Sequence, residues 1–545
     1  MRAFATLLDG LVYTQSRNRK TALLAAYFRN TPDPDRGWAL AALTDGVAIR
    51  LPLRRMVGDL TSRFIDPVLY KMSRDYVGDT AETVALLWPD IKSDIKSDNK
   101  NDIKPDPLST ADRGNGPSID SVIRTMSSGT AAERTEALGG FLNQLDVSGR
   151  WALLKLLGGA PRVGVSARLA KTALAEAFTH DLKDIEELWH ALDAPYTSLF
   201  AWLEGHGPKP DPGSKPVFRP VMLAHPVEAE DWPKLDAHDF AAEWKWDGIR
   251  VQIAARGGDV RMFSRQGDDI SLAFPEIRSA FVAQDCVADG ELLVVRAGVI
   301  APFNDLQQRL NRKTVTLKML RDYPAHVRLY DLLFDSAGDL RLLPFSRRRA
   351  RLEAWHAAHA PPLTDLSALV PFETFDDLNA LWSSARAEGI EGLMLKRRDS
   401  AYQAGRIKGQ WFKWKRAALT LDCVLMYAQR GSGKRSSFYS DYTFGIWRTS
   451  DGGNRELVPV GKAYSGFTDD ELRQLDKWIR GHTTETFGPV RAVEPGLVFE
   501  VAFDAVQAST RHKSGVAMRF PRIHRIRWDK PAAEADTLET VKALV

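Results

Sequence analysis

The segment EWKWDGIR, from Glu243 to Arg250, is the starting point for interpreting the fold. It predicts a strand that carries Lys245 and runs into an Asp-Gly turn, so that the lysine lies at a strand end facing a cleft. Arg250 follows five residues after the lysine, where its guanidinium could hold a ribose or a phosphate. An exposed lysine in an ordinary hairpin is the alternative that this short pattern leaves open.

The residues after this segment predict a mixed α+β domain that ends near Lys415. Ile249, Val251 and Ile253 alternate with more polar positions, as in a half-buried strand. Further β-rich runs are VADGELLVV, VRLYDLLF and GLMLKR, and helical patterns occupy 345–358 and 374–388 between them.

The first 204 residues are predicted to be helical. Apolar residues recur at helical spacing from Phe4 to Leu11, which favours an amphipathic helix over a targeting segment. Asp and Lys then alternate at four-residue intervals from Asp90, and we expect the stretch of about 90–118 to be a flexible, solvated insertion. A charge run that binds a partner is the alternative. Helical patterning resumes at Ile119 and continues to about Trp202.

A glycine-rich segment, GGAPRVG, precedes a helix for which Ser166 is the expected N-cap. Such a segment leaves backbone amides near a helix N-terminus, and Arg162, Gly164 and Arg168 lie in or beside it. This arrangement suits a phosphate backbone, although a simple turn between helices would have the same composition.

The segment GHGPKPDPGSKP marks a linker at 205–217 because it is rich in Gly and Pro. From Leu419 onward strands dominate, in the runs LDCVLMYAQ, YTFGIWR, ELVPVGKAY, GLVFEVAFDAV and RIHRIRW. Five short strands predict a small β-barrel.

Composition narrows the class of protein. The 545 residues and 60.8 kDa correspond to several domains, and 74 basic against 70 acidic residues give a net charge of +4. A nucleic-acid-binding protein of this charge must concentrate its basic residues locally. Two cysteines and no Cys/His cluster argue against a disulfide framework or structural zinc and fit a reducing cytoplasmic compartment. No apolar run reaches the length that spans a membrane, so we expect no membrane association.

Six segments after the linker occur in a fixed order: FSRQG (263–267), ADGELLV (288–294), VRLYDLLF (327–334), EGLMLK (391–396), WFKWK (411–415) and RFPRIHRIRWDK (519–530). With KWDGIR they resemble the motifs of ATP-dependent DNA ligases, members of the covalent nucleotidyltransferase superfamily. The likeness is closest to bacterial ligases of three domains. AHPV (224–227), PFNDLQQRL (302–310) and VGKAYSGFTDDEL (460–472) look similar as well.

The resemblance implies a multidomain fold. It comprises an all-α DNA-binding domain at 1–204, an α+β nucleotidyltransferase domain at 218–416, and a β-barrel OB-fold domain at 417–545. It also implies an enzyme that seals 5′-phosphate/3′-hydroxyl nicks in duplex DNA through a lysine–AMP intermediate and a DNA-adenylate. ATP and a divalent cation are the expected cofactors, Mg²⁺ first and Mn²⁺ second. A monomer that encircles nicked DNA, a role in repair, replication or recombination, and helicase or nuclease partners are further expectations.

The lysine nucleophile implied by the resemblance is Lys245. A free lysine has a pKa of about 10.4, so its neutral form costs about 4.6 kcal/mol at pH 7, and a cationic, partly desolvated site lowers that cost. In the family's pattern, Glu243 accepts from the adenine amino group, Tyr330 stacks on the adenine, and Glu291 and Glu391 hold the metal. The implied ATP-binding residues are Glu243, Arg250, Arg265, Glu291, Tyr330, Lys396, Arg406, Lys413, Lys415, Arg522, Asp529 and Lys530. The implied DNA contacts are Arg162, Gly164, Arg168 and Arg265.

The last motif lies in the main basic cluster, with seven Lys or Arg and one acid between Arg511 and Lys530. In the family this element acts on the pyrophosphate leaving group of ATP. Two departures from the family's pattern stand out. SRQGDD replaces the usual SRN, and Ile407 occupies the position of a common arginine, for which Arg406 or Lys408 could substitute. GSGKRSS at 431–437 imitates a phosphate-binding loop, but we interpret it as an ordinary loop that could touch DNA.

Two other functions fit part of this pattern. One is an RNA ligase or a GTP-using capping enzyme, which the helical N-terminal region argues against. The other is a non-catalytic nick-binding protein, which the presence of Lys245, Glu291 and Glu391 together argues against.

Overall fold

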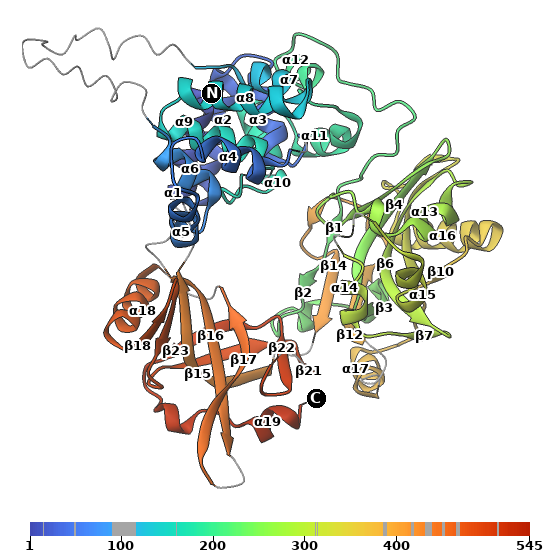
Figure 1. Ribbon diagram of the computed structural model, residues 1–545. Coiled ribbons are helices and arrows are strands. Elements are labelled where there is room, and N and C mark those ends of the chain that lie inside the picture. Colours follow the sequence, from blue (N-terminus) through green and yellow to red (C-terminus); the bar gives the residue numbers. More distant parts are fainter. Residues whose placement is uncertain are drawn as a thin grey trace, which may run out of the picture. The chain divides into compact units, whose positions relative to one another are not determined.

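The structure is a computed structural model (Figure 1). It describes residues 1–14, 16–47, 49, 51–89, 116–159, 161–310, 312, 314–384, 390–415, 419–430, 439–449, 453–464, 469–509 and 512–544. Almost all of the expected insertion at 90–118, and all of GSGKRSS, lie outside these residues. Contacts within the chain define two compact units, 1–23 with 47–165 and 417–545, and 24–46 with 166–416. The predicted domain boundaries remain a prediction.

The described part of the first 204 residues is helical, as predicted. Ser166 caps α10 through a hydrogen bond from the Leu169 amide to its hydroxyl, at 3.2 Å, and the apolar face of that helix is buried. In the described part of the chain, no helix combines the length and the apolar content needed to cross a membrane. The helices are α1 (Arg2–Tyr13), α2 (Arg17–Asn30), α3 (Asp35–Leu43), α4 (Leu53–Thr61), α5 (Pro67–Val77), α6 (Thr80–Leu87), α7 (Ile119–Ser127), α8 (Ala131–Gln144), α9 (Val147–Leu157), α10 (Ala167–Phe178), α11 (Leu182–Leu188) and α12 (Thr197–Leu203).

Two sheets form the centre of the α+β part. One has the strand order β10-β8-β6-β4-β5, in which β7 also pairs with β6 and β9 with β8, and the other has the order β11-β3-β12-β14-β2. Their strands are β2 (His225–Pro226), β3 (Phe240–Trp246), β4 (Ile249–Arg256), β5 (Asp259–Ser264), β6 (Cys286–Arg296), β7 (Val299–Ile300), β8 (Ala325–Asp335), β9 (Gly338–Asp339), β10 (Thr364–Leu366), β11 (Leu369–Val370), β12 (Ile390–Arg397) and β14 (Trp411–Lys415). A separate short pair joins β1 (Met222–Leu223) to β13 (Gly405–Arg406).

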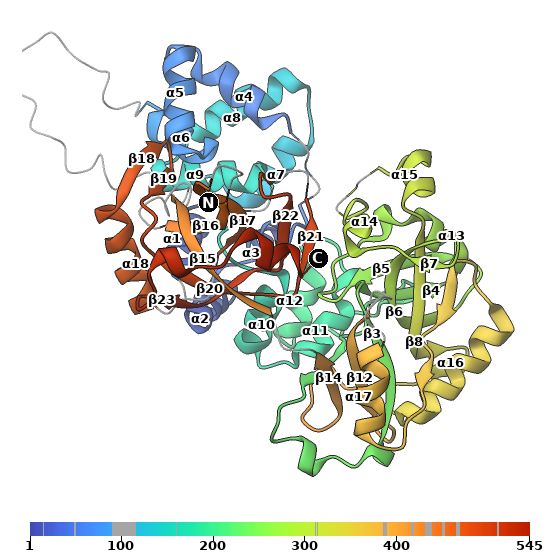
Figure 2. The ribbon, with the colours of Figure 1, turned by 90° about the horizontal axis from the view of Figure 1, so that it is seen from below.

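Helices cover one face of each sheet (Figures 1 and 2). α13 (Pro275–Phe281) and α16 (Phe345–His359) pack on the first sheet, in a core that includes Val251 and Ile253. α17 (Phe375–Ser384) packs on the second sheet, in a core that includes Phe240 and Leu395. Two short helices, α14 (Phe303–Gln307) and α15 (Leu317–Asp322), lie between β7 and β8 in the chain.

The other faces of the two sheets meet in a third core. Ala241 of β3 contributes to it from the second sheet, and Ala254 of β4 and Val287 of β6 contribute from the first. Side chains alternate along a strand, so Glu243 and Lys245 lie on the same face of β3 as Ala241. Strand periodicity therefore directs these polar residues between the two sheets, whereas Phe240 and Ala242 face α17.

Among the described residues, the C-terminal part forms a seven-stranded sheet beside a large core, and β21 and β22 form a separate pair. β15 pairs with β16, β19 and β20. The prediction of five strands was incomplete. A hairpin of β18 and β19 and a helix, α18, were not predicted, and GLVFEVAFDAV is interrupted at Asp504 between β20 and β21. The elements are β15 (Leu419–Arg430), β16 (Tyr439–Thr449), β17 (Arg455–Ala463), α18 (Asp469–Gly481), β18 (Thr483–Phe487), β19 (Val490–Val493), β20 (Val498–Phe503), β21 (Ala505–Ala508), β22 (Val516–Arg519), β23 (Arg522–Arg527) and α19 (Leu538–Lys542).

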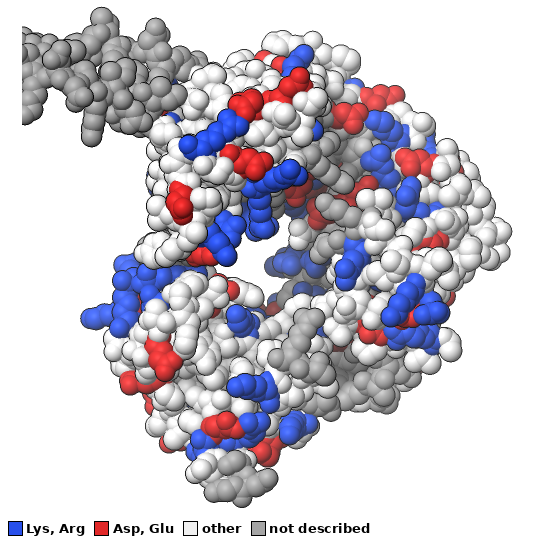
Figure 3. Space-filling view, viewed as in Figure 1, with Lys and Arg blue, Asp and Glu red and all other residues white. Residues whose placement is uncertain are grey.

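Charges are mixed over the surface. On the face drawn in Figure 3, basic and acidic side chains are interspersed within each part of the chain, in keeping with the small net charge of +4. A positively charged site must therefore arise where the fold brings several basic side chains together.

Candidate active site

Lys245 lies near the end of β3, and its ammonium donates a hydrogen bond to the carboxylate of Glu391 on β12. The Lys415 ammonium on β14 is 3.1 Å from the same carboxylate. Burial alone would raise the pKa of Glu391. The charges and hydrogen bonds of Lys245 and, to a smaller extent, of Lys415 outweigh burial and lower that pKa to about 2. Glu391 is therefore ionised at neutral pH and joins two lysines from neighbouring strands.

A β-bulge explains why Glu391 reaches the two lysines. In the ladder between β12 and β3, Ile390 pairs with Trp246 and Gly392 pairs with Lys245, so Glu391 is the extra residue. Bulges redirect a side chain and are common beside active sites. Gly392 is needed in this arrangement because a Cβ there would come within 2.2 Å of the Trp414 carbonyl oxygen.

Glu291 on β6 is the second carboxyl group of the site. Burial raises its pKa to about 7, Lys245 and Arg250 act against this rise, and Glu391 and Asp247 add to it. Gly248 allows the turn after β3 to pass close to Glu291, since a Cβ at position 248 would lie 2.7 Å from Cγ of Glu291. The two carboxyl groups thus differ in charge state near neutral pH.

Arg250 of β4 is held by a buried network. Its guanidinium donates to the Asp289 carboxylate, to the Met222 carbonyl oxygen at 2.6 Å, and to the Tyr402 hydroxyl at 2.9 Å. Tyr402 donates in turn to Asp289, which is fully buried. Sequence reasoning missed Asp289 and Tyr402 as supports of Arg250. The DGE segment contained Asp289, but nothing local in the sequence indicated that Tyr402 would meet it.

Tyr330 also occupies a bulge. Asp289 pairs with Asp331 and Gly290 pairs with Leu329, which leaves Tyr330 as the extra residue of β8. Its ring lies 4.6 Å from the Lys396 ammonium and 5.9 Å from the Arg250 guanidinium, measured to the ring centroid. The ring is partly exposed rather than part of the apolar core, as a stacking platform requires.

Glu243 and Lys396 form an ion pair of 2.9 Å, and each side chain is only 2% exposed. Burial lowers the pKa of Lys396, and Glu243 opposes that shift. The Lys396 ammonium also lies within 5 Å of the ring centroids of Phe345 and Trp411. The two residues hold each other at the inner face of the second sheet.

The remaining cations gather beside these residues. Burial lowers the pKa of Arg265, and Arg250 and Arg406 lower it further. Burial likewise lowers the pKa of Lys413, followed by the charges of Lys415 and Arg406. The charge of Arg406, one of the two candidates for the arginine expected at Ile407, thus acts on both Arg265 and Lys413. The structure brings together Glu243, Lys245, Arg250, Arg265, Glu291, Tyr330, Glu391, Lys396, Arg406, Lys413 and Lys415.

Comparisons with known proteins agree with this geometry. Residues 221–415 match the family described as "ATP dependent DNA ligase domain", and residues 435–530 match "ATP dependent DNA ligase C terminal region". A "Probable DNA ligase" of Koribacter versatilis is 36% identical over 417 residues, which are 72% of this chain and 71% of that protein. The chain belongs to the ATP-dependent DNA ligases. It is therefore an enzyme that uses ATP and forms phosphodiester bonds in DNA.

Two further comparisons extend over most of this ligase. A "Probable DNA ligase" of Anaeromyxobacter sp. is 34% identical over 437 residues, covering 78% of this chain and 82% of the relative. A solved structure titled "Pmar-Lig_PreS3" covers 96% of this chain and 99% of its own, with a TM-score of 0.54 and 17% identity. The second likeness concerns the fold alone. Together they support a multidomain ligase with a nucleotidyltransferase domain and an OB-fold-type C-terminal domain.

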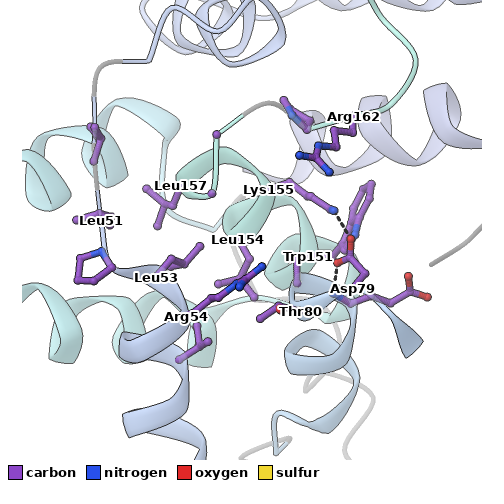
Figure 4. A pocket seen from close by; sticks show the side chains of 18 of the residues that line it. Leu51, Leu53, Arg54, Asp79, Thr80, Trp151, Leu154, Lys155, Leu157 and Arg162 are labelled. Atoms are coloured by element: carbon purple, nitrogen blue, oxygen red, sulfur yellow. Dashed lines mark hydrogen bonds and ion pairs between the residues drawn. The ribbon is translucent and has the colours of Figure 1, made fainter. Parts of the chain in front are cut away.

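The helical part of the ligase contains a cavity of about 890 Å³ (Figure 4). Leu53, Trp151 and Leu154 contribute apolar lining, and Arg54 and Arg162 contribute positive charge. Neither arginine forms an ion pair with any other described residue, whereas Lys155 pairs with Asp79, as the dashed line in Figure 4 indicates.

The predicted DNA-contact residues of the ligase differ in their surroundings. Arg162 has a left-handed backbone, with φ of 55°, and the Lys20 ammonium donates to the carbonyl oxygens of Val163 and Gly164, both at 3.0 Å. Lys20 therefore fixes the loop that carries Arg162 and Gly164. Arg168 lies 3.5 Å from Glu186, so its charge is partly compensated.

The C-terminal motif of the ligase lies on β23 and in the turn after it. Lys530 donates to Asp422 at 2.7 Å, Arg527 pairs with Asp529 at 2.9 Å, and Arg522 lies 3.3 Å from Asp504. Arg527 together with the peptide group of Asp529 keeps the pKa of that carboxyl at about 2. Acids pair with these three cations, namely Asp529 within the motif, Asp422 on β15 and Asp504 between β20 and β21.

Proposed function

We propose that this ligase seals nicks with a 5′-phosphate and a 3′-hydroxyl in duplex DNA by three successive displacement reactions at phosphorus. Lys245 Nζ attacks the α-phosphate of ATP, the bond to the β-phosphate breaks, and pyrophosphate leaves. The 5′-phosphate of the nick then takes AMP from the lysine, and the 3′-hydroxyl finally displaces AMP as the phosphodiester forms. The observation that carries this proposal is the cluster of Lys245, Glu391 and Lys415 beside Arg250, Glu291 and Tyr330.

The surroundings of Lys245 support its role as the nucleophile. A lysine attacks only when it is neutral, and nearby positive charge in a desolvated site favours the neutral form. The charge of Lys413 interacts with that of Lys245, and the Lys245 ammonium donates to Glu391, which Lys415 also approaches. A group that draws the Glu391 carboxylate away from the ammonium would therefore favour attack.

Two carboxyl groups fit a divalent cation. The raised pKa of Glu291 reflects burial together with the repulsion of Glu391 and Asp247, and a cation held by both glutamates would relieve that repulsion. Oxygen ligands of this kind suit Mg²⁺ or Mn²⁺. A bound cation would neutralise charge that develops on the phosphates, and the chain's own part is to hold the two carboxylates beside Lys245.

The nucleotide-binding roles rest on the same cluster. We assign adenine stacking to Tyr330, recognition of the adenine amino group to Glu243, and contacts with the ribose or phosphates to Arg250, Arg265, Arg406, Lys413 and Lys415. Glu243 must exchange part of its contact with Lys396 when adenine enters, because the two are paired in the structure. Lys396 then acts on the phosphates through its charge. Arg522, Asp529 and Lys530 act during the adenylation step.

DNA contacts are assigned to the helical part and to the catalytic site. We propose that Arg162, Gly164 and Arg168 contact the phosphate backbone and that Arg265 contacts the nick phosphate. No described residue forms an ion pair with Arg162, which lines the cavity, so it supports this assignment more strongly than the paired Arg168 does. The proposal also includes an all-α DNA-binding domain at 1–204 and a monomer that encircles DNA. It further includes a cytoplasmic, nucleoid-associated location and a repair role with helicase or nuclease partners.

Transfer of label from ATP tests this function. With [α-³²P]ATP and Mg²⁺ but no DNA, the protein should acquire label, and nicked duplex should then chase that label into DNA and free AMP. Label that enters the protein but cannot be chased by a nick would contradict DNA sealing. An RNA ligase would instead pass the label to a nicked RNA and not to DNA.

A further inference from the structure

Four of the five cations of the C-terminal motif, residues 519–530, are paired with acids within the β-rich part of the chain. Arg522 meets Asp504, Arg525 meets Glu500 at 2.8 Å, Arg527 meets Asp529, and Lys530 meets Asp422. Four acids therefore offset four cations. These pairs offset most of the positive charge of the motif, although the sequence of the motif alone is strongly basic.

Asp422 is the most enclosed of these acids. It lies on β15, and its side chain is 13% exposed, whereas Asp504 and Asp529 are 37% and 70% exposed. Its Oδ2 faces Lys530 at 2.7 Å and Arg527 at 3.5 Å, and its buried Oδ1 has no hydrogen-bond partner among the described residues. One carboxylate thus holds both terminal cations of the motif.

The backbone of Asp422 is fixed independently of its carboxylate. Its amide donates to the Asp536 carboxylate at 2.8 Å, and the Asp536 amide donates to its carbonyl oxygen at 2.9 Å. Removing the charge of the side chain therefore leaves these strand contacts in place. The side chains of Lys530 and Arg527 are long, so they can exchange one acceptor for another.

We propose that Asp422 is a positioning residue that holds Lys530 and Arg527 against the β-sheet and competes with the triphosphate of ATP for them. Carboxylate and phosphate oxygens bind the same ammonium and guanidinium donors, so ATP must displace Asp422 before these cations can act. This inference rests on the proposed role of Lys530 in adenylation. It adds that the ATP concentration needed for that step is set partly by an acid outside the motif.

The test is Asp422→Asn in the full-length protein. Asparagine keeps an oxygen for Lys530 and removes only the charge. The KM for ATP in lysine–AMP formation without DNA should fall at least threefold, and sealing of a nick that already carries a 5′-adenylate should stay within twofold of wild type. Glu456→Gln is the matched control, because it removes a carboxylate that pairs with Arg448 in the same sheet, and it should change neither value.

A double variant separates competition from a general effect on the fold. In a Lys530→Gln background, adding Asp422→Asn should lower the KM for ATP much less than it does in wild type. An unchanged or higher KM in Asp422→Asn, or an equal change in both steps, would overturn the proposal. An unfolded Asp422→Asn protein would also overturn it, since the carboxylate would then be a structural requirement. A wild-type protein that forms no lysine–AMP would instead refute the proposed function.

Discussion

The affinity of the active site for a divalent cation should depend on pH through Glu291. Burial is the main cause that raises the pKa of this carboxyl from its model-peptide value of 4.5 to about 7. This rise corresponds to about 3 kcal/mol by which the site favours the protonated form. Glu391, with a pKa of about 2, stays ionised over the same range and contributes no pH dependence there.

The sign follows from competition between the proton and the cation. Only ionised Glu291 binds a metal, so binding releases a proton when the pH is below about 7. The apparent dissociation constant for Mg²⁺ should rise about tenfold for each unit of pH below that point and should be nearly constant above about pH 8. Higher Mg²⁺ should therefore move the acidic limb of the adenylation rate to lower pH.

Single-turnover formation of lysine–AMP without DNA measures this dependence, at a series of Mg²⁺ concentrations and constant ionic strength. Glu291→Gln is the control because it has no proton to release, whereas the titration of ATP itself contributes equally to both proteins. The wild type should lose Mg²⁺ affinity more steeply than the variant as the pH falls. The same dependence in both proteins would refute the assignment of Glu291 as a titrating ligand.

Three further predictions concern other parts of the molecule. Glu391→Ala should slow adenylation by a hundredfold or more, about 3 kcal/mol, with nick binding nearly unchanged, and a near-wild-type rate at saturating Mg²⁺ would contradict its role. Asp331→Asn should lower the free energy of unfolding, measured by urea titration, by about 3–5 kcal/mol. The reason is that it breaks an ion pair with Arg348 in which both side chains are 0% exposed. A loss below about 1 kcal/mol would contradict this prediction. Burial lowers the pKa of His190 to about 4, so between about pH 6.5 and pH 4 this histidine is protonated in the unfolded chain but neutral in the folded chain. The free energy of unfolding should therefore fall by about 3 kcal/mol as the pH drops from about 6.5 to about 4. His190→Gln should remove that slope, and an equal slope in the variant would show that other groups cause it.

Periodicity in the sequence predicted the elements that position the active site. Alternation after EWKWDGIR correctly identified β4, and the same rule explains why Glu243 and Lys245 share a face with Ala241. The capping role of Ser166 was also predictable, because a hydroxyl before an apolar helical pattern is a local signal. The family resemblance was confirmed by the comparisons.

The register shifts between strands could not be predicted from the sequence. Glu391 and Tyr330 each occupy a bulge, and a bulge depends on how two strands pair rather than on the residues of either strand alone. The ion pair of Glu243 with Lys396 joins residues 153 positions apart and was not predicted.

Charge compensation between distant strands was missed for the same reason. The motif from Arg519 to Lys530 contains one acid, but Asp422, Glu500 and Asp504 come from β15 and from the region of β20. A count of charges within a motif cannot include acids that only the sheet brings near. Arg406 and Lys408 were likewise equivalent in sequence, and the effect of the Arg406 charge on Arg265 became visible only in the structure.

The central claim is that Lys245 carries AMP. Incubation with ATP and Mg²⁺, followed by proteolysis and mass spectrometry, should find an added mass of about 329 Da on the peptide that contains Lys245, as a lysine–AMP bond requires. Lys245→Ala should acquire no AMP and should still bind a nick nearly as well as the wild type. AMP on any other residue of the wild-type protein would contradict the account.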